Sequence, residues 1–308
     1  MMTNPTLTLL IGYFAFLTLS TLVGDIMSLR NPNNGTILNL NARIRAWWIM
    51  SLVIIGALWA GAGGVTILFA LISMASLREF ITIAAKRKSD HWSLAAAFYV
   101  ILPIQYFSVW MGWYGFFAIF IPVYAFFFLP LLSVIRQDTQ DFLARVTQTQ
   151  WGLMISVYAL SHIPALLILD FPTNHAPYWM IVFLIACSQG GDVMQYIFGK
   201  TFGKTPMVPK ISPNKTWGGF IGGTLGVMLL GAALHFVTPF TPLWSGLIAG
   251  GITAAGTVGG LVMSAIKRDK NIKDWGHTIQ GHGGFLDRVD SLAFSAPLLF
   301  HISRFFWT

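Results

Sequence analysis

Cysteine and charged residues are both scarce in this chain. The one cysteine, Cys187, lies in an apolar run, which excludes an internal disulfide and a cysteine-based metal site. We interpret it as a small buried hydrophobic side chain. Only 10% of the 308 residues are charged whereas 55% are hydrophobic, and this is more apolar surface than one globular core requires. The composition therefore predicts an integral membrane protein.

The amino-terminal segment lacks the features of a secretory signal peptide. No lysine or arginine precedes Arg30, and no small-residue cleavage site follows the apolar run at 7–23. We predict that this run is a retained first span. Eight more apolar runs approach the roughly 20 residues that a helix needs to cross the bilayer core. They cover 47–77, 92–110, 116–135, 151–169, 178–198, 217–237, 243–266 and 291–307.

The run at 47–77 is ambiguous, because glycines interrupt it and it forms either one tilted helix or two short ones. If it forms two, the loops at 25–46, 78–91, 136–150, 199–216 and 267–290 share one side of the membrane. Those loops carry 18 of the 19 lysines and arginines and leave Arg304 on the other side. Because cytoplasmic loops collect basic residues, we favour two helices, with both termini outside. The predicted fold is all-α, a polytopic membrane protein of about nine to ten transmembrane helices.

Acidic residues are scarcer than basic ones, and 4 of the 11 lie within the segment 267–290. Two of them, Asp287 and Asp290, are three positions apart, so on a helix their carboxylates lie on one face. Oxygen ligands of this kind suit Mg²⁺, which usually binds one or two carboxylates together with substrate phosphates. Positive-inside bias accounts for lysines and arginines but not for these acids.

The same segment has the composition of a phosphate site. Gly283 and Gly284 allow close approach of the backbone to a ligand, and His282 can orient a phosphate or act as an acid or base. Each feature has an ordinary alternative, because a basic loop is usually a cytoplasmic anchor and a glycine pair is usually a turn. Their joint occurrence favours a site. The basic residues of the segment are Lys267, Arg268, Lys270, Lys273 and Arg288.

A second polar cluster precedes it at 199–223. Ser212, Lys215 and Thr216 lead directly into the next apolar run, where the start of a helix favours anions. The alternative is a capped helix entry beside cytoplasmic lysines. No P-loop or dinucleotide-binding spacing occurs. A helix-packing face is the better interpretation of the following glycines. These are Gly218, Gly219, Gly222, Gly223 and Gly226.

The segment 264–290 resembles the signature of the CDP-diacylglycerol synthases, also called phosphatidate cytidylyltransferases. That signature reads Ser, two residues, Lys-Arg, four residues, Lys-Asp, one residue, a small residue, then His-Gly-Gly, two residues, Asp-Arg, one residue, Asp. The matching positions here are Ser264, Lys267, Arg268, Lys273, Asp274, Gly276, His282, Gly283, Gly284, Asp287, Arg288 and Asp290.

Weaker similarity extends upstream. The segment 212–217 is similar to the family's Ser-Pro-x-Lys-Thr-Trp element, Asp192 with Tyr196 resembles its Asp-x-x-Ala-Tyr element, and Glu79-Phe80 resembles a pair near its early spans. Three positions depart from the family pattern and indicate a divergent branch. These are Gln280, Gly218 and Gln195.

The resemblance implies transfer of CMP from CTP to phosphatidate, which yields CDP-diacylglycerol and pyrophosphate. It implies metal binding by Asp287, Asp290 and Asp274, with Mg²⁺ as the cofactor, and it leaves a second, monovalent cation open. Ser212, Lys215, Thr216 and Asp192 would bind substrate, as would Gly283 and Gly284. The other residues of the implied catalytic set are Lys267, Arg268, Lys273, His282 and Arg288.

The expected partners are CTP, phosphatidate or a related anionic lipid, and membrane lipids; no nucleic acid is expected, and a homodimer is left open. The expected location is the cell membrane, with the active site facing the cytoplasm. Within one integrated membrane domain, 1–170 would supply amino-terminal helices and 171–308 the catalytic region. Two alternatives remain. One is a CTP-dependent polyprenol or phytol kinase, and the other is an anion transporter whose path Asp192 and the cationic loops would line.

Overall fold

The computed structural model describes residues 5–32, 34–84, 86–171, 177–276, 278 and 283–308. The described residues form ten helical units, and the predicted all-α membrane fold is confirmed. Eight helices or joined helices are long and apolar enough to cross a membrane, while α11 has 17 residues and α13 carries charges near both ends. Single-helix units are α1 (Pro5–Arg30), α2 (Gly35–Trp59), α3 (Gly61–Ile83), α10 (Tyr178–Phe202), α11 (Trp217–Ala233), α12 (Pro242–Asp269) and α13 (Leu286–Trp307).

Three units consist of two α-helices joined by a π-helical segment. Pro103 follows one such segment, and Pro122 lies within another. Proline removes a backbone donor and so disrupts the regular hydrogen-bond ladder of an α-helix. The units are α4 (His91–Ala96) with α5 (Leu102–Trp110), α6 (Tyr114–Ile119) with α7 (Phe126–Val134), and α8 (Phe142–Leu153) with α9 (Leu160–Ala165).

The ambiguous run at 47–77 is divided between α2 and α3, as predicted. Gly61, whose φ is +75°, lies at the break, and this left-handed conformation suits a residue without a Cβ. The predicted loop at 25–46 is wrong in extent, because most of it is helical. The side chain of Asn41 donates to the Gly24 carbonyl at 3.2 Å, and Trp48 Nε1 donates to Thr21 Oγ1 at 3.1 Å. Polar side chains of α2 are thus bonded to α1, which hydropathy alone does not reveal.

Helices α10, α11 and α12 pack closely through glycine. A Cβ added to Gly223 would lie 2.5 Å from the Gln195 side chain, and one added to Gly222 would lie 2.6 Å from Phe198. The helix-packing interpretation of these glycines is confirmed. Gln195, one of the departures from the family pattern, donates to Thr257 Oγ1 at 2.7 Å and so links α10 to α12.

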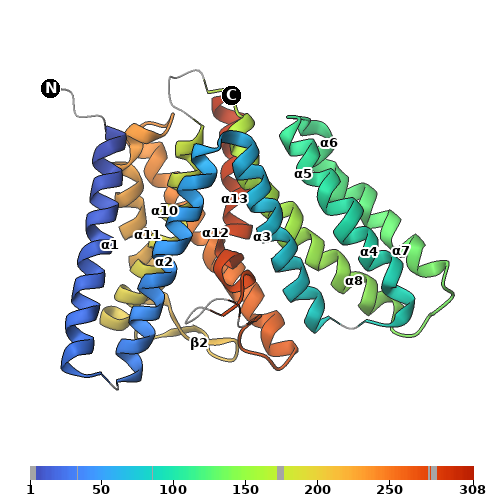
Figure 1. Ribbon diagram of the computed structural model, residues 1–308, viewed down its shortest axis with the longest axis horizontal. Helices are drawn as coiled ribbons and strands as arrows, with labels where there is room; N and C mark the ends of the chain where they lie inside the picture. The colour runs from blue at the N-terminus through green and yellow to red at the C-terminus, as the bar shows by residue number, and fades with distance from the viewer. Residues whose placement is uncertain (1–4, 33, 85, 172–176, 277, 279–282) are drawn as a thin grey trace.

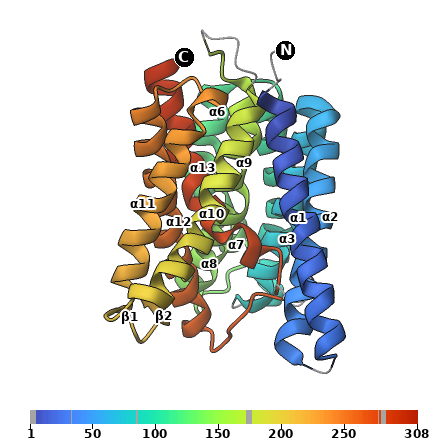
Figure 2. The same cartoon turned by 90° about the vertical axis from the view of Figure 1, so that its left-hand side faces the viewer.

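A short β-hairpin lies at one end of the bundle. Strand β1 (Pro206–Val208) pairs antiparallel with β2 (Ser212–Thr216) between α10 and α11. Figures 1 and 2 show the start of α1 and the end of α13 at the opposite end. Thr216 ends β2 and caps α11, since its Oγ1 accepts a hydrogen bond from the Gly219 amide at 3.1 Å. The capped helix entry, which was the alternative at this position, is therefore present.

A buried ion pair fixes the start of α8. Arg145 Nη1 lies 2.7 Å from Asp90 Oδ1, and their side chains are only 2% and 7% exposed. The same guanidinium donates to Ser89 Oγ at 2.8 Å and to the Asp138 carbonyl at 2.8 Å. The Ser89 hydroxyl, helped by Arg87 and Arg145, holds the pKa of Asp138 below its usual value. This network joins the start of the α4–α5 unit to α8 without involving any predicted site residue.

Candidate functional site

The candidate site lies where α10, β2, α12 and α13 meet. The Asp192 carboxylate of α10 is within electrostatic range of Lys215 from β2 and Arg288 from α13, and it lies 3.5 Å from the Ser291 hydroxyl. Asp290 is within range of Asp192, Asp287 and Lys267. The structure therefore brings together predicted residues that lie up to about a hundred positions apart in the chain.

Asp287 organises the loop that precedes α13. Its Oδ1 accepts a hydrogen bond from Lys267 Nζ at 2.8 Å, and the two side chains are 5% and 12% exposed. Its Oδ2 accepts the backbone amides of Trp275 at 2.8 Å and Gly284 at 3.0 Å. One buried carboxylate thus connects the end of α12, the signature loop and the first turn of α13.

Glu79 of α3 holds the same loop from the other side. Its Oε1 accepts from the Phe285 amide at 3.0 Å, and its Oε2 accepts from the Leu286 amide at 2.9 Å. These donors belong to the start of α13, where an anion is favoured by the helix dipole. The sequence resemblance included Glu79 in a weak match with Phe80 and implied no role for it. It is the one glutamate of the chain, and an isolated acid at the end of an apolar span is a signal for such a role.

The glycines of the signature make room for these two carboxylates. A Cβ added to Gly284 would lie 2.4 Å from Glu79 Oε2, and one added to Gly276 would lie 2.9 Å from Glu79 Oε1. Gly283 has φ +82°, and a Cβ there would lie 2.7 Å from Asp287 Oδ2. The predicted substrate-binding role of Gly283 and Gly284 stays a prediction, but their fit against carboxylates is a sufficient reason for glycine.

Two further contacts anchor the loop and the hairpin. The indole of Trp275 stacks on Phe80 of α3 with a centroid distance of 5.2 Å and an interplanar angle of 21°. Arg268, predicted to bind phosphate, donates to the Ile272 carbonyl at 3.1 Å and reaches the Ile211 carbonyl at 3.4 Å. Glu79 and Phe80 therefore act as one clamp on the signature loop, and Arg268 links that loop to the hairpin.

Asp192 and Asp290 are two carboxylates within electrostatic range of each other. Asp192 is exposed and Asp290 half-buried, and the two negative side chains repel each other. Asp287 fits a metal less well, because Lys267 and two amides already occupy its oxygens. Within the described ranges, no group of three or more His, Cys, Asp or Glu side chains is arranged to hold a metal ion. Two carboxylates with basic side chains in electrostatic range still match the donor set that Mg²⁺ prefers when phosphates complete its coordination.

Several predicted residues lie away from this pair or outside the description. Lys273 and Asp274 are exposed. Ser212 is half-buried at the start of β2. His282 and Gln280 lie outside the described residues, so the prediction for His282 stays untested. Asp274 is not joined to Asp287 and Asp290 in a three-carboxylate cluster of the described part of the chain.

The clamp formed by Glu79 can be tested through stability. In Glu79→Gln, the neutral amide keeps one acceptor oxygen but directs N–H groups at backbone donors, so we expect a loss of about 1–3 kcal/mol. The melting temperature of the purified protein should fall by several degrees, and amide exchange at 283–288 should become faster. Asp141→Asn is the matched control, because Asp141 makes no side-chain cap and its φ of 51° suits asparagine. Equal exchange in Glu79→Gln and wild type would contradict the clamp.

Comparisons with known proteins place the chain in a family. Residues 41–306 match the cytidylyltransferase family. The chain is 36% identical over 301 residues to the uncharacterized protein YnbB of Escherichia coli K12, covering 95% of this chain and 96% of that protein. It is 35% identical over 149 residues to a phosphatidate cytidylyltransferase of Rickettsia bellii, covering 46% of this chain and 64% of that enzyme.

A phosphatidate cytidylyltransferase of Aquifex aeolicus is 41% identical over 126 residues, which cover 41% of this chain and 47% of that enzyme. The chain thus matches less than two thirds of the length of each of these two enzymes, whereas the family match spans most of the chain itself. The match to 41–306 includes Glu79, Asp192, Lys215 and the whole signature loop. This chain is therefore a member of the cytidylyltransferase family and a nucleotidyltransferase.

Proposed function

We propose that the protein transfers CMP from CTP to phosphatidate and so forms CDP-diacylglycerol and pyrophosphate. The observation that carries this proposal is that Asp192 lies within electrostatic range of Asp290, Lys215 and Arg288. Acids alone would repel a nucleoside triphosphate, and bases alone would serve as a membrane anchor. Acidic and basic side chains within electrostatic range of one another suit phosphates that arrive with a divalent cation.

The reaction joins two anions, so electrostatics governs it. An oxygen of the lipid phosphate attacks the α-phosphorus of CTP, and the bond between that phosphorus and the bridging oxygen to the β-phosphate breaks. Pyrophosphate leaves with the bonding electrons. The attacking phosphate is already ionised at neutral pH, so no general base is required. Lys215 and Arg288 would neutralise phosphate oxygens and position them, which is the main source of rate in such transfers.

Asp290 and Asp192 would hold Mg²⁺. The ion would neutralise charge on the triphosphate and on the leaving pyrophosphate. Asp287 has a different task in this proposal, because it keeps Lys267 and the first turn of α13 in place. A second, monovalent cation and a homodimer were left open by the sequence and form no part of this proposal.

The site would lie at the cytoplasmic face of the cell membrane. The hairpin end carries most of the basic loops, and CTP is a cytoplasmic nucleotide. At the end of a span, the lipid headgroup can enter between helices while its acyl chains stay in the bilayer. Extraction of those chains into water would cost about 0.8 kcal/mol for each exposed CH₂.

Labelled CTP distinguishes the candidate reactions. Purified protein with Mg²⁺, phosphatidate in detergent and CTP labelled at the α-phosphate should yield labelled lipid and unlabelled pyrophosphate. Transfer of label from the γ-phosphate to a lipid alcohol would instead identify a kinase. If neither label enters lipid and sealed vesicles accumulate an anionic metabolite, the protein is a transporter.

The placement of Lys215 can be changed from a neighbouring helix. A Cβ added to Gly260 of α12 would lie 3.0 Å from Lys215 Nζ, so Gly260→Ala should displace this flexible ammonium by a few tenths of an ångström. We expect kcat/KM for CTP to fall about threefold to tenfold, because small displacements of a positioning group are expensive in catalysis. The melting temperature should not fall, since alanine favours a helix by about 1 kcal/mol over glycine.

Gly251→Ala on the same helix is the matched control. Its added Cβ would meet Leu298 Cδ2 at an ordinary 3.6 Å. Unchanged kcat/KM in Gly260→Ala would show that Lys215 does not contribute from its observed position.

A further inference from the structure

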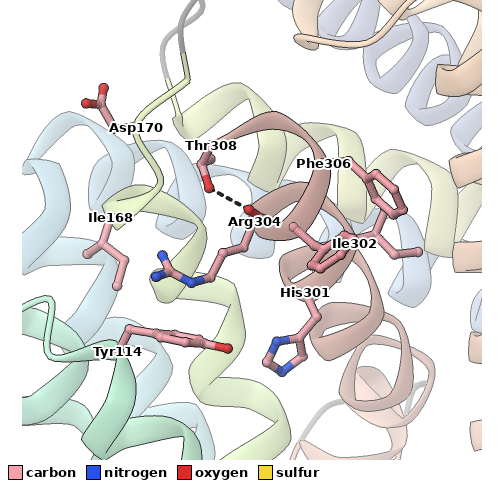
Figure 3. A pocket seen from close by; sticks show the side chains of 9 residues that line it. Tyr114, Ile168, Asp170, His301, Ile302, Arg304, Phe306 and Thr308 are labelled. Atoms are coloured by element: carbon pink, nitrogen blue, oxygen red, sulfur yellow. Dashed lines mark hydrogen bonds between the residues drawn. The ribbon is translucent and has the colours of Figure 1, made fainter.

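A cavity with charged side chains in its lining lies at the end of the bundle opposite the hairpin. It has a volume of about 830 Å³ and is lined by residues of α6, α13 and the segment that follows α9. Figure 3 shows these side chains around the end of α13, close to the carboxy terminus. Because the site described above lies at the hairpin end, this carboxy-terminal cavity is a separate feature. Its lining includes Tyr114, Asp170, His301, Arg304, Phe305 and Phe306.

Arg304 supplies a cation without an acidic partner. Its guanidinium carbon lies 3.8 Å above the centroid of the Tyr114 ring. No carboxylate of the described residues approaches it within 4.0 Å, and none of the hydrogen bonds among them uses the guanidinium. Stacking occupies the face of the guanidinium and leaves its edge donors available. Arg304 can therefore donate hydrogen bonds to a planar or tetrahedral oxyanion within the cavity.

Asp170 supplies an anion in the same cavity. It is exposed, and within the described part of the chain it has no ion pair or hydrogen bond of its side chain. Figure 3 shows Asp170 and Arg304 on different segments, with Arg304 directed toward Tyr114. The two opposite charges share one cavity and yet do not pair with each other. Such an arrangement suits a ligand that carries both charges itself.

The surroundings of the cavity indicate a lipid. Phe305 and Phe306 are 80% and 66% exposed at the carboxy-terminal end of α13. In membrane proteins, aromatic and arginine side chains are enriched at the level of the lipid headgroups. Arg304 is also the one basic residue that the charge distribution places opposite the basic loops, so positive-inside bias does not explain it.

We propose that the carboxy-terminal cavity binds the headgroup of a zwitterionic phospholipid with a primary amine. Arg304 donates to the phosphodiester oxygens, and Asp170 accepts from the ammonium group. The acyl chains follow Phe305 and Phe306 into the bilayer. An anionic headgroup with glycerol in place of the amine accepts hydrogen bonds from Arg304 only. Its negative charge is also repelled by the Asp170 carboxylate. A trimethylammonium headgroup lacks the N–H donors that a carboxylate accepts.

The test uses short-chain lipids below their critical micelle concentrations. Dihexanoyl phosphatidylethanolamine, phosphatidylcholine and phosphatidylglycerol are titrated into the purified full chain in detergent, and bound lipid is counted by native mass spectrometry. Wild type should bind the ethanolamine lipid about tenfold more tightly than the glycerol lipid, which corresponds to one charge-assisted contact. Arg304→Gln should weaken the binding of the ethanolamine lipid and of the glycerol lipid by about tenfold each. Asp170→Asn should remove only the preference for the ethanolamine lipid.

Controls separate this proposal from two simpler explanations. Arg30→Gln and Asp25→Asn remove the same charges from exposed positions of α1 at the other end of the bundle, and they should leave the titrations unchanged. Inorganic phosphate should compete weakly. Equal binding of all three lipids, or full competition by phosphate, would overturn the zwitterionic site. Unchanged binding in an Arg304→Gln protein with wild-type melting temperature would overturn it as well.

Discussion

Asp290→Asn is expected to lower CMP transfer at least about 100-fold without lowering the melting temperature. Asparagine has the same shape, and its oxygen can still accept the Ser291 amide, which lies 2.7 Å from Asp290 Oδ1. The substitution also relieves repulsion between Asp290 and Asp192. What is lost is one of the two negative groups proposed to hold Mg²⁺. Turnover measured with α-labelled CTP checks the first part, and thermal unfolding in detergent checks the second.

A second readout makes this prediction independent of turnover. Mg²⁺ should raise the melting temperature of wild type, because a ligand that binds only the folded state stabilises it, and Asp290→Asn should lose most of that rise. Asp269→Asn is the matched control, since it removes one carboxylate from a side chain that is 73% exposed at the end of α12. Turnover within tenfold of wild type, together with an intact Mg²⁺ response, would contradict the metal assignment.

Asp287→Asn should reduce both turnover and stability, unlike Asp290→Asn. The change leaves the Lys267 ammonium, whose side chain is 12% exposed, without the carboxylate that it contacts. Removing one partner of a buried pair costs about 3–5 kcal/mol, and the lower end applies here because asparagine still accepts a backbone amide. We expect the melting temperature to fall by several degrees and turnover to fall at least about 100-fold, since the signature loop loses its organising charge.

The double variant Lys267→Met with Asp287→Asn separates the two effects. It removes both charges of the pair, so most of the lost stability should return. Turnover should stay low, because Lys267 and the fixed loop are both absent. Recovery of turnover together with stability would show that Asp287 and Lys267 contribute only to folding. A melting temperature of Asp287→Asn equal to that of wild type would contradict the structural role of the pair.

Much of the fold could be predicted from hydropathy and charge. The division at Gly61 followed from the distribution of lysine and arginine, and the packing role of Gly222 and Gly223 followed from their spacing. The extent of α2 could not be predicted in this way. Asparagine and arginine lower the hydropathy of its first half, whereas in the structure Asn41 forms a hydrogen bond to α1. Polar residues inside a membrane protein are satisfied by neighbouring helices, and a single-sequence pattern contains no information on those neighbours.

For the candidate site, sequence alone identified the ingredients. Scarce acids in an apolar chain singled out Asp192, Asp287 and Asp290, and the spacing within 264–290 singled out the family. Only tertiary structure distinguished their tasks. Asp287 is saturated by Lys267 and two amides, while Asp192 of α10 lies within electrostatic range of Asp290 of α13. Glu79, about two hundred positions away, caps α13, because backbone donors at a helix start need an acceptor and the fold places this carboxylate of α3 beside them.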